Sequence, residues 1–178
     1  MKKQEKIDII QKCIEETQLC RVYFSYDSGL FFYSYPMAVS DKFILGYEED
    51  DFILDGLFIR KISHLKKAEI RLDKCNEINK AEGLTKQLTD PGIDLSSWQS
   101  IFRSLAAQDQ YVLIEDHIND QVAVGKIQKV LKNKLYLKRF NAKGVWLEGE
   151  LEIPYSSVTS VEWGTRYVTH WRHYLEEK

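Results

Sequence analysis

Short runs of aromatic and β-branched residues, separated by polar turns, make up most of this chain. Such runs predict strands at 20–26, 30–39, 43–47, 52–62 and 68–72, and again at 111–116, 122–130, 134–140, 145–154 and 159–163. Apolar residues at helical spacing predict a helix over 5–17, a second that begins after Ser96 or Ser97, and a third from about Thr165. We therefore expect a helix followed by five strands, twice, and then a final helix. Asp27-Ser28-Gly29 is typical of a turn between the first two strands.

The chain repeats part of its sequence about midway along its length. Asp55-Gly56 and Ile62–Ile70 match Glu148-Gly149 and Tyr155–Trp163 at a separation of 93 residues. A repeat of this length indicates two copies of one domain, because the units of solenoid proteins are shorter. We expect a first domain at 1–72, a linker at 73–97 and a second domain at 98–178.

This layout, with a tight turn between the fourth and fifth strands, resembles the Sm-like fold, a small barrel of the SH3-like group. The resemblance covers residues 5–72 and 97–163, and Gly125-Lys126-Ile127 is similar to a glycine-x-leucine element of that family. It implies a mainly β chain with flanking helices (α+β), built from two five-stranded barrels. Leu131 and Leu135 stand where Sm-like proteins carry an aspartate and an asparagine for RNA, so RNA binding is not carried over. The layout is also similar to uncharacterised bacterial proteins with tandem small barrels.

Side-chain alternation suggests a contact surface on the first domain. If alternate residues of 43–47 and 54–58 point inward, then Ile44, Leu57 and Ile59 point outward. A strand that is apolar on both faces is normally covered on both faces. The candidates for this cover are the first helix, the final helix, the sister domain or another protein chain. Ile44, Leu57 and Ile59 are therefore candidate contacts for a partner protein or for self-association into a dimer.

The second domain has a charged outer face instead. One hairpin is expected to pair Lys138 with Glu148, Tyr136 with Glu150 and Lys134 with Glu152. The basic residues outside this ladder are candidate contacts for an anion or a nucleic acid: Lys126, Lys129, Lys132 and Arg139. The net charge of −2 disfavours a general nucleic-acid-binding protein. Nucleic-acid binding is therefore the alternative function rather than the first.

The sequence offers little for catalysis. Cys13, Cys20 and Cys75 lack the paired spacing of a metal site and are expected to be free thiols in a reducing cytosol. A glycine-rich phosphate loop, a secretory signal and an apolar run long enough to span a membrane are also missing from the sequence. We expect a cytoplasmic, non-catalytic protein–protein interaction protein, of adaptor or immunity type, that needs no cofactor or metal.

Overall fold

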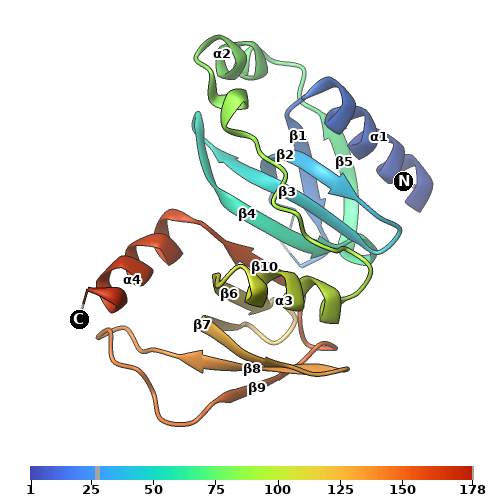
Figure 1. Ribbon diagram of the computed structural model, residues 1–178. Coiled ribbons are helices and arrows are strands. Elements are labelled where there is room, and N and C mark those ends of the chain that lie inside the picture. Colours follow the sequence, from blue (N-terminus) through green and yellow to red (C-terminus); the bar gives the residue numbers. More distant parts are fainter. Residues whose placement is uncertain (27–28, 178) are drawn as a thin grey trace. The chain divides into compact units, whose positions relative to one another are not determined.

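A computed structural model describes residues 1–26 and 29–177 (Figure 1). Contacts divide the chain into two compact units, Met1–Pro91 and Gly92–Lys178. Each unit contains one helix followed by five strands, as the repeat predicted. The expected turn at Asp27-Ser28-Gly29 includes residues 27–28, which lie outside the described residues.

The first unit is an antiparallel sheet with a helix before it and two short helices after it. Its strands lie in the order β5-β1-β2-β3-β4. Its elements are α1 (Lys3–Glu16), β1 (Cys20–Phe24), β2 (Phe32–Val39), β3 (Phe43–Asp50), β4 (Ile53–Lys61), the 3-10 helix η1 (Ile62–His64), β5 (Leu65–Ile70), α2 (Cys75–Ala81) and the 3-10 helix η2 (Leu84–Gln87).

The second unit has the same strand order, β10-β6-β7-β8-β9. Its elements are α3 (Trp98–Ala107), β6 (Tyr111–Asp116), β7 (Gln121–Val130), β8 (Lys134–Arg139), β9 (Leu151–Pro154), β10 (Ser160–Trp163) and α4 (Arg166–Glu176). Both helices begin where the sequence predicted. The Ser97 hydroxyl accepts the Ser100 backbone N–H, and the Thr165 hydroxyl accepts the Val168 backbone N–H.

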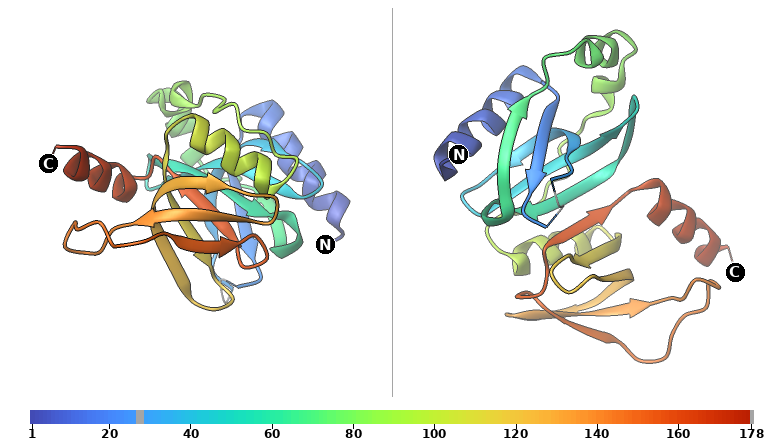
Figure 2. Two further views of the ribbon diagram at one scale, coloured as in Figure 1. Left: turned by 60° about the horizontal axis from the view of Figure 1, so that its bottom comes forward. Right: turned by 180° about the vertical axis from the view of Figure 1, so that it is seen from behind.

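The prediction of two closed five-stranded barrels is wrong. Within the described residues, β4 does not pair with β5, and β9 does not pair with β10, so each unit keeps an open antiparallel sheet. Closure would require these end strands to meet. In the second unit β9 is only four residues long. After β8 the chain turns and pairs with it again at Trp146 and Leu147, and residues 148–150 then leave the sheet before β9 begins (Figure 2). The fold is mixed α+β.

The expected charged ladder of the second unit is displaced by two residues. Tyr136 lies opposite Glu152, and Lys134 lies opposite Pro154. Residues 148–150, which leave the sheet before β9, take up the difference. An even shift keeps every side chain on its predicted face. The Glu152 carboxylate still accepts hydrogen bonds from Lys134 at 2.9 Å and from Tyr136 at 2.8 Å.

The predicted pairing of β3 with β4 is wrong by one residue. Leu45 lies opposite Ile59, and Tyr47 lies opposite Leu57. The turn between these strands consists of Asp51 and Phe52 alone, both at positive φ (47° and 69°). Next to this turn Asp50 lies opposite Ile53 and Glu49 lies opposite Leu54, and a β-bulge between Tyr47 and Glu49 then shifts the register by one residue. A shift of one residue exchanges the two faces of a strand.

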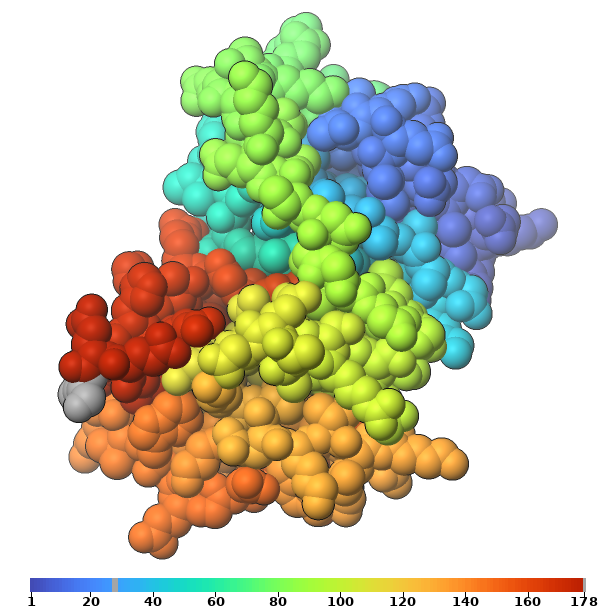
Figure 3. Space-filling model, viewed as in Figure 1, coloured from blue at the N-terminus to red at the C-terminus, as the bar shows by residue number. Residues whose placement is uncertain are grey.

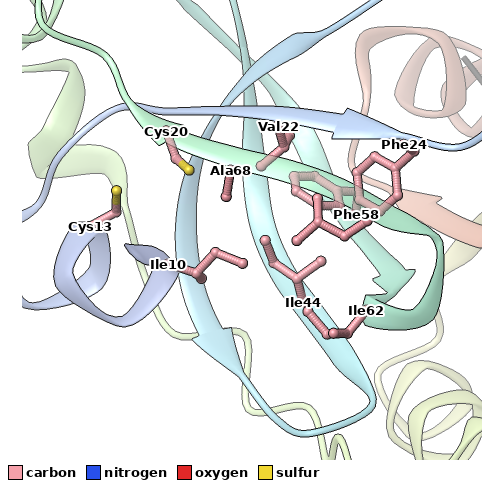
Figure 4. Packing of buried hydrophobic residues seen from close by; sticks show 10 residues of the cluster. Ile10, Cys13, Cys20, Val22, Phe24, Ile44, Phe58, Ile62 and Ala68 are labelled. Atoms are coloured by element: carbon pink, nitrogen blue, oxygen red, sulfur yellow. The ribbon is translucent and has the colours of Figure 1, made fainter. Parts of the chain in front are cut away.

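Ile44 consequently lies in the core of the first unit rather than on its surface. Its side chain is fully buried and belongs to one cluster with Ile10 of α1 and Phe58 of β4 (Figure 4). Ile59 is also fully buried, and Leu57 is half-buried. The three candidate contacts therefore do not form one exposed apolar patch.

The segment expected to be a linker covers the opposite face of the first sheet. Leu84 and Leu88 pack with Tyr35 and Tyr47 in a second apolar cluster. Figures 1 and 3 show this segment, in light green, lying across β2 and β3. The sequence reading correctly required a cover for this face but did not consider residues 84–88 as that cover.

A buried polar network fixes α2 in place. Asn76 Oδ1 accepts the Leu19 backbone N–H at 3.1 Å and the Tyr35 hydroxyl at 3.0 Å. Asn79 donates to the same hydroxyl at 3.0 Å and to the Glu49 carboxylate at 3.4 Å. Asn76 and Asn79 are 5% and 1% exposed. Burial of this kind is stable only when the polar groups are paired.

The three cysteines predict a graded thiol reactivity. All are free, but Cys13 and Cys20 are buried in the core whereas Cys75 is half-buried. The pKa directions do not set this order, because burial raises the pKa of Cys75 and the hydrogen bond with Cys20 lowers the pKa of Cys13. Access of the reagent sets it, since a thiol enclosed in the core cannot be reached. In a thiol titration with Ellman's reagent, we expect Cys75 to react in the native protein and the other two only in denaturant. Rapid reaction of all three thiols in the native protein would contradict this burial.

Candidate binding cleft in the second unit

The second sheet has one apolar face, here called the inner face. It carries the buried aliphatic side chains of four strands: Val112, Ile114, Ile127, Leu135, Leu137 and Ile153. Residues directly opposite each other on antiparallel strands point to the same side. Ala123 lies opposite Ile114, and Arg139 lies opposite Gly125, so both belong to the inner face. Asp116, two residues after Ile114, also points there.

A cleft of about 560 Å³ opens on this face. This volume is typical of sites that hold a small molecule or a few side chains. The cleft is lined by residues of β6, β7, β8 and β9 and of the turns that follow β6 and β9: Ile114, Glu115, Asp116, Asp120, Gln121, Val122, Ala123, Arg139, Leu151, Glu152, Ile153, Pro154 and Ser157.

In the first unit, three aromatic rings fill the matching space. Phe32 stacks on Phe24 at 5.8 Å between ring centroids and meets Phe58 edge-on at 5.2 Å. Phe24 and Phe58 are fully buried. These rings leave little room for a ligand between the strands that carry them.

The repeat and the strand pairing identify the corresponding residues of the second unit. Phe58 matches Leu151 in the sequence repeat. Val22 pairs with Ala68 as Ile114 pairs with Val161, and Ala68 and Val161 match in the repeat. Phe32, opposite Val22, and Phe24, two residues after it, therefore correspond to Ala123 and Asp116. The cleft exists because a methyl group, a carboxylate and an isobutyl group replace three rings.

Asp116 is held rigidly at one end of the cleft. It is 8% exposed and accepts the backbone N–H groups of Ile118 and Asn119, each at 3.1 Å. The Asn119 side chain donates a third hydrogen bond at 2.7 Å. Burial by itself would raise the pKa of Asp116, but these hydrogen bonds outweigh burial and lower it. Asp116 is therefore ionised at neutral pH, and its oxygens are already engaged.

Arg139 is the one candidate residue from the sequence that the structure places in the cleft. It is half-buried in the cleft. Its guanidinium forms no hydrogen bond, ion pair or cation–π contact with any residue in the described part of the chain. A guanidinium on an apolar face favours an anionic partner, because its five donors otherwise lose water without replacement.

The structure separates Arg139 from the other three basic candidates. Lys126 lies opposite Lys138 on the outer face and forms an ion pair with Asp109 at 2.7 Å. Lys129 is also on the outer face, and Lys132 is in the turn before β8. The four residues therefore do not converge on one anion-binding surface.

A serine, a carboxylate and a histidine lie together near the cleft, but not in a catalytic order. Ser160 donates to the Glu115 carboxylate at 2.6 Å, and His117 Nε2 is 3.4 Å from the same oxygen. Ser160 is fully buried. A nucleophilic serine needs a histidine as its base and access to substrate. This group provides neither, so its contribution here is structural.

The sequence reading missed the residues that create the cleft, Asp116, Ala123 and Leu151. The sequence repeat alone supplies one of these exchanges, Phe58 with Leu151, whereas the correspondences of Phe32 with Ala123 and of Phe24 with Asp116 require the strand pairing. Comparison with protein-family models, curated proteins and solved structures gives no match to this chain. Among the described helices, none is both long and apolar enough to cross a membrane.

Proposed function

We propose that this chain is a non-catalytic interaction protein, in which the cleft of the second unit holds a segment of a partner protein. The observation that carries the proposal is Arg139, a cation on an apolar inner face that has no partner among the residues the structure describes. Proteins bind such segments with a few fixed polar groups that orient the ligand and an apolar surface that supplies affinity. The second unit presents this combination, whereas aromatic rings fill the matching place in the first unit.

The charge around the cleft supports a protein partner over a nucleic acid. Besides Arg139, the cleft has Asp116 on the inner face and Asp120 in the turn after β6, while Glu115 and Glu152 border it from the outer face. A phosphate backbone brings one negative charge per nucleotide and binds through several unpaired lysines or arginines. A single arginine among acids does not meet that requirement. A partner segment with both apolar and charged side chains does.

Filling the cleft should abolish partner binding without unfolding the protein. In Ala123→Phe, the new ring occupies the space that Phe32 occupies in the first unit. We expect partners captured from the native host's lysate by the wild-type chain to fall at least about tenfold, as quantified by mass spectrometry. The unfolding temperature of the second unit should be unchanged or higher, because the ring fills an open space.

Gln128→Phe is the matched control, since it adds the same ring to an exposed position of β7 outside the cleft. Its capture should equal that of the wild type. The proposal is wrong if Ala123→Phe captures the same partners in the same amounts, or if the wild-type chain enriches nothing relative to a blank resin.

A further inference from the structure

The charged groups of the cleft differ in whether they are already engaged. Asp116, the carboxylate on the inner face, is bound by Ile118 and Asn119. The two carboxylates that border the cleft from the outer face are also bound, Glu115 by Ser160 and Glu152 by Lys134 and Tyr136. Arg139 has no such partner within the described residues. The charged group of the cleft that most needs a partner is therefore the Arg139 guanidinium, which favours a negatively charged ligand.

The surrounding acids restrict which negative charge fits. A carboxylate carries one charge, whereas a phosphate monoester carries about 1.5 to 2 at pH 7. Like charges that share a site repel each other more strongly when they are partly removed from water. A carboxylate can accept two parallel N–H bonds from a guanidinium while adding the least charge to an acidic site.

The apolar lining of the cleft indicates which kind of group carries this carboxylate. The cleft's apolar side chains are aliphatic: Ile114, Val122, Ala123, Leu151, Ile153 and Pro154. No aromatic ring lines it among the described residues, so neither stacking nor a cation–π contact is offered to a planar ligand. Burial of aliphatic carbon next to Arg139 supplies affinity in proportion to the area covered.

From these three observations we infer that the cleft recognises a carboxylate borne on an aliphatic chain. Resting on the proposed function, the inference assigns that carboxylate to the partner segment, as an acidic side chain or a C-terminus flanked by aliphatic residues. The Arg139 guanidinium donates parallel N–H hydrogen bonds to the carboxylate, and Leu151 and Ile153 cover the aliphatic carbons. A phosphorylated segment is disfavoured.

A titration with small probes tests the recognition chemistry by itself. Hexanoate, hexyl phosphate and hexylamine share one chain and differ only in the charged group. We follow them by the backbone amide signals of Ala123 and Leu151 in ¹⁵N NMR spectra. Hexanoate should shift both signals with a millimolar Kd, hexyl phosphate should bind at least about fivefold more weakly, and hexylamine should not bind.

Variants show whether Arg139 is responsible. Arg139→Gln should weaken hexanoate binding at least about tenfold, because it removes the charged partner. Arg139→Lys should recover only part of the affinity, because lysine lacks the fork of donors. Lys143→Gln, at an exposed position outside the cleft lining, is the control and should bind as the wild type does. Equal binding by wild type and Arg139→Gln, or tighter binding of hexyl phosphate, overturns the inference.

Partner capture separates this inference from the proposed function. If Ala123→Phe loses its partners while Arg139→Gln keeps them, the cleft binds a partner but does not select a carboxylate. If hexanoate binds as expected while Ala123→Phe keeps its partners, the carboxylate site stands and the protein-binding function falls. If a free carboxylate binds and the wild-type chain enriches no protein, the ligand is a small acid rather than a partner segment.

Discussion

Replacing Asn76 by leucine should destabilise the first unit by about 3 kcal/mol. The Asn76 amide oxygen accepts two buried groups, the Leu19 N–H and the Tyr35 hydroxyl. Leucine removes that acceptor and leaves both donors inside the protein without water, each at a cost of about 1 to 3 kcal/mol. Hydrogen exchange of peptides from the first unit measures the loss directly.

Glu77→Leu is the matched control, because it places the same side chain on the next, exposed position of α2. Its effect should stay within about 0.5 kcal/mol. All four tryptophans, Trp98, Trp146, Trp163 and Trp171, belong to the second unit. Their fluorescence therefore reports whether that unit is unaffected. Equal destabilisation by both variants would show that the polar network does not hold α2 in place.

Replacing Gly125 by alanine should have a similar effect on the second unit. A Cβ atom at this position would overlap the carbonyl oxygen of Lys138, because β7 and β8 approach each other closely there. Backbone cannot move aside as a flexible side chain can, so we expect a loss of about 3 kcal/mol. The tryptophan-detected unfolding temperature should fall by roughly 10 °C or more.

The control for this experiment is Gly164→Ala. Gly164 has a positive φ of 65°, but a Cβ atom there meets no neighbour within 4 Å. Its cost should be limited to the backbone conformation, about 1 kcal/mol. If Gly125→Ala is no more harmful than Gly164→Ala, the two strands are not as close as described.

Local signals predicted the elements of this fold well. Alternation of apolar residues located the strands, and Ser97 and Thr165 marked helix starts because their hydroxyls accept backbone N–H groups. Each of these signals acts within a few residues. The repeat then identified the two copies, since similar strings of side chains build similar supersecondary structure.

Register and closure could not be predicted in the same way. The pairing of β3 with β4 depends on a β-bulge between Tyr47 and Glu49, where the facing stretch of β4 contains Gly56 at a positive φ of 81°. The missing closure depends on where the chain between 140 and 150 rejoins the sheet. Both are tertiary outcomes, and an error of one residue moved Ile44 from the surface to the core.

The candidate site was predicted in part. Arg139 was named from the sequence because it lies in a basic run without a paired acid. Its neighbours were not, because the repeat was read for residues that agree. The exchange of Phe58 for Leu151 could be seen in the repeat, but the exchange of Phe32 for Ala123 could not, because it becomes evident only from the strand pairing.

The hollow interior of the second unit also has an energetic consequence. The aromatic rings that pack in the first unit are missing from the second. Replacing a buried phenylalanine by alanine lowers the free energy of unfolding by about 3 to 5 kcal/mol. In the first unit these rings stabilise the fold, whereas in the second unit the same place remains an open cleft. A ligand bound in this cleft makes contacts that the missing rings would otherwise make. Ligand binding therefore raises the free energy of unfolding of the second unit.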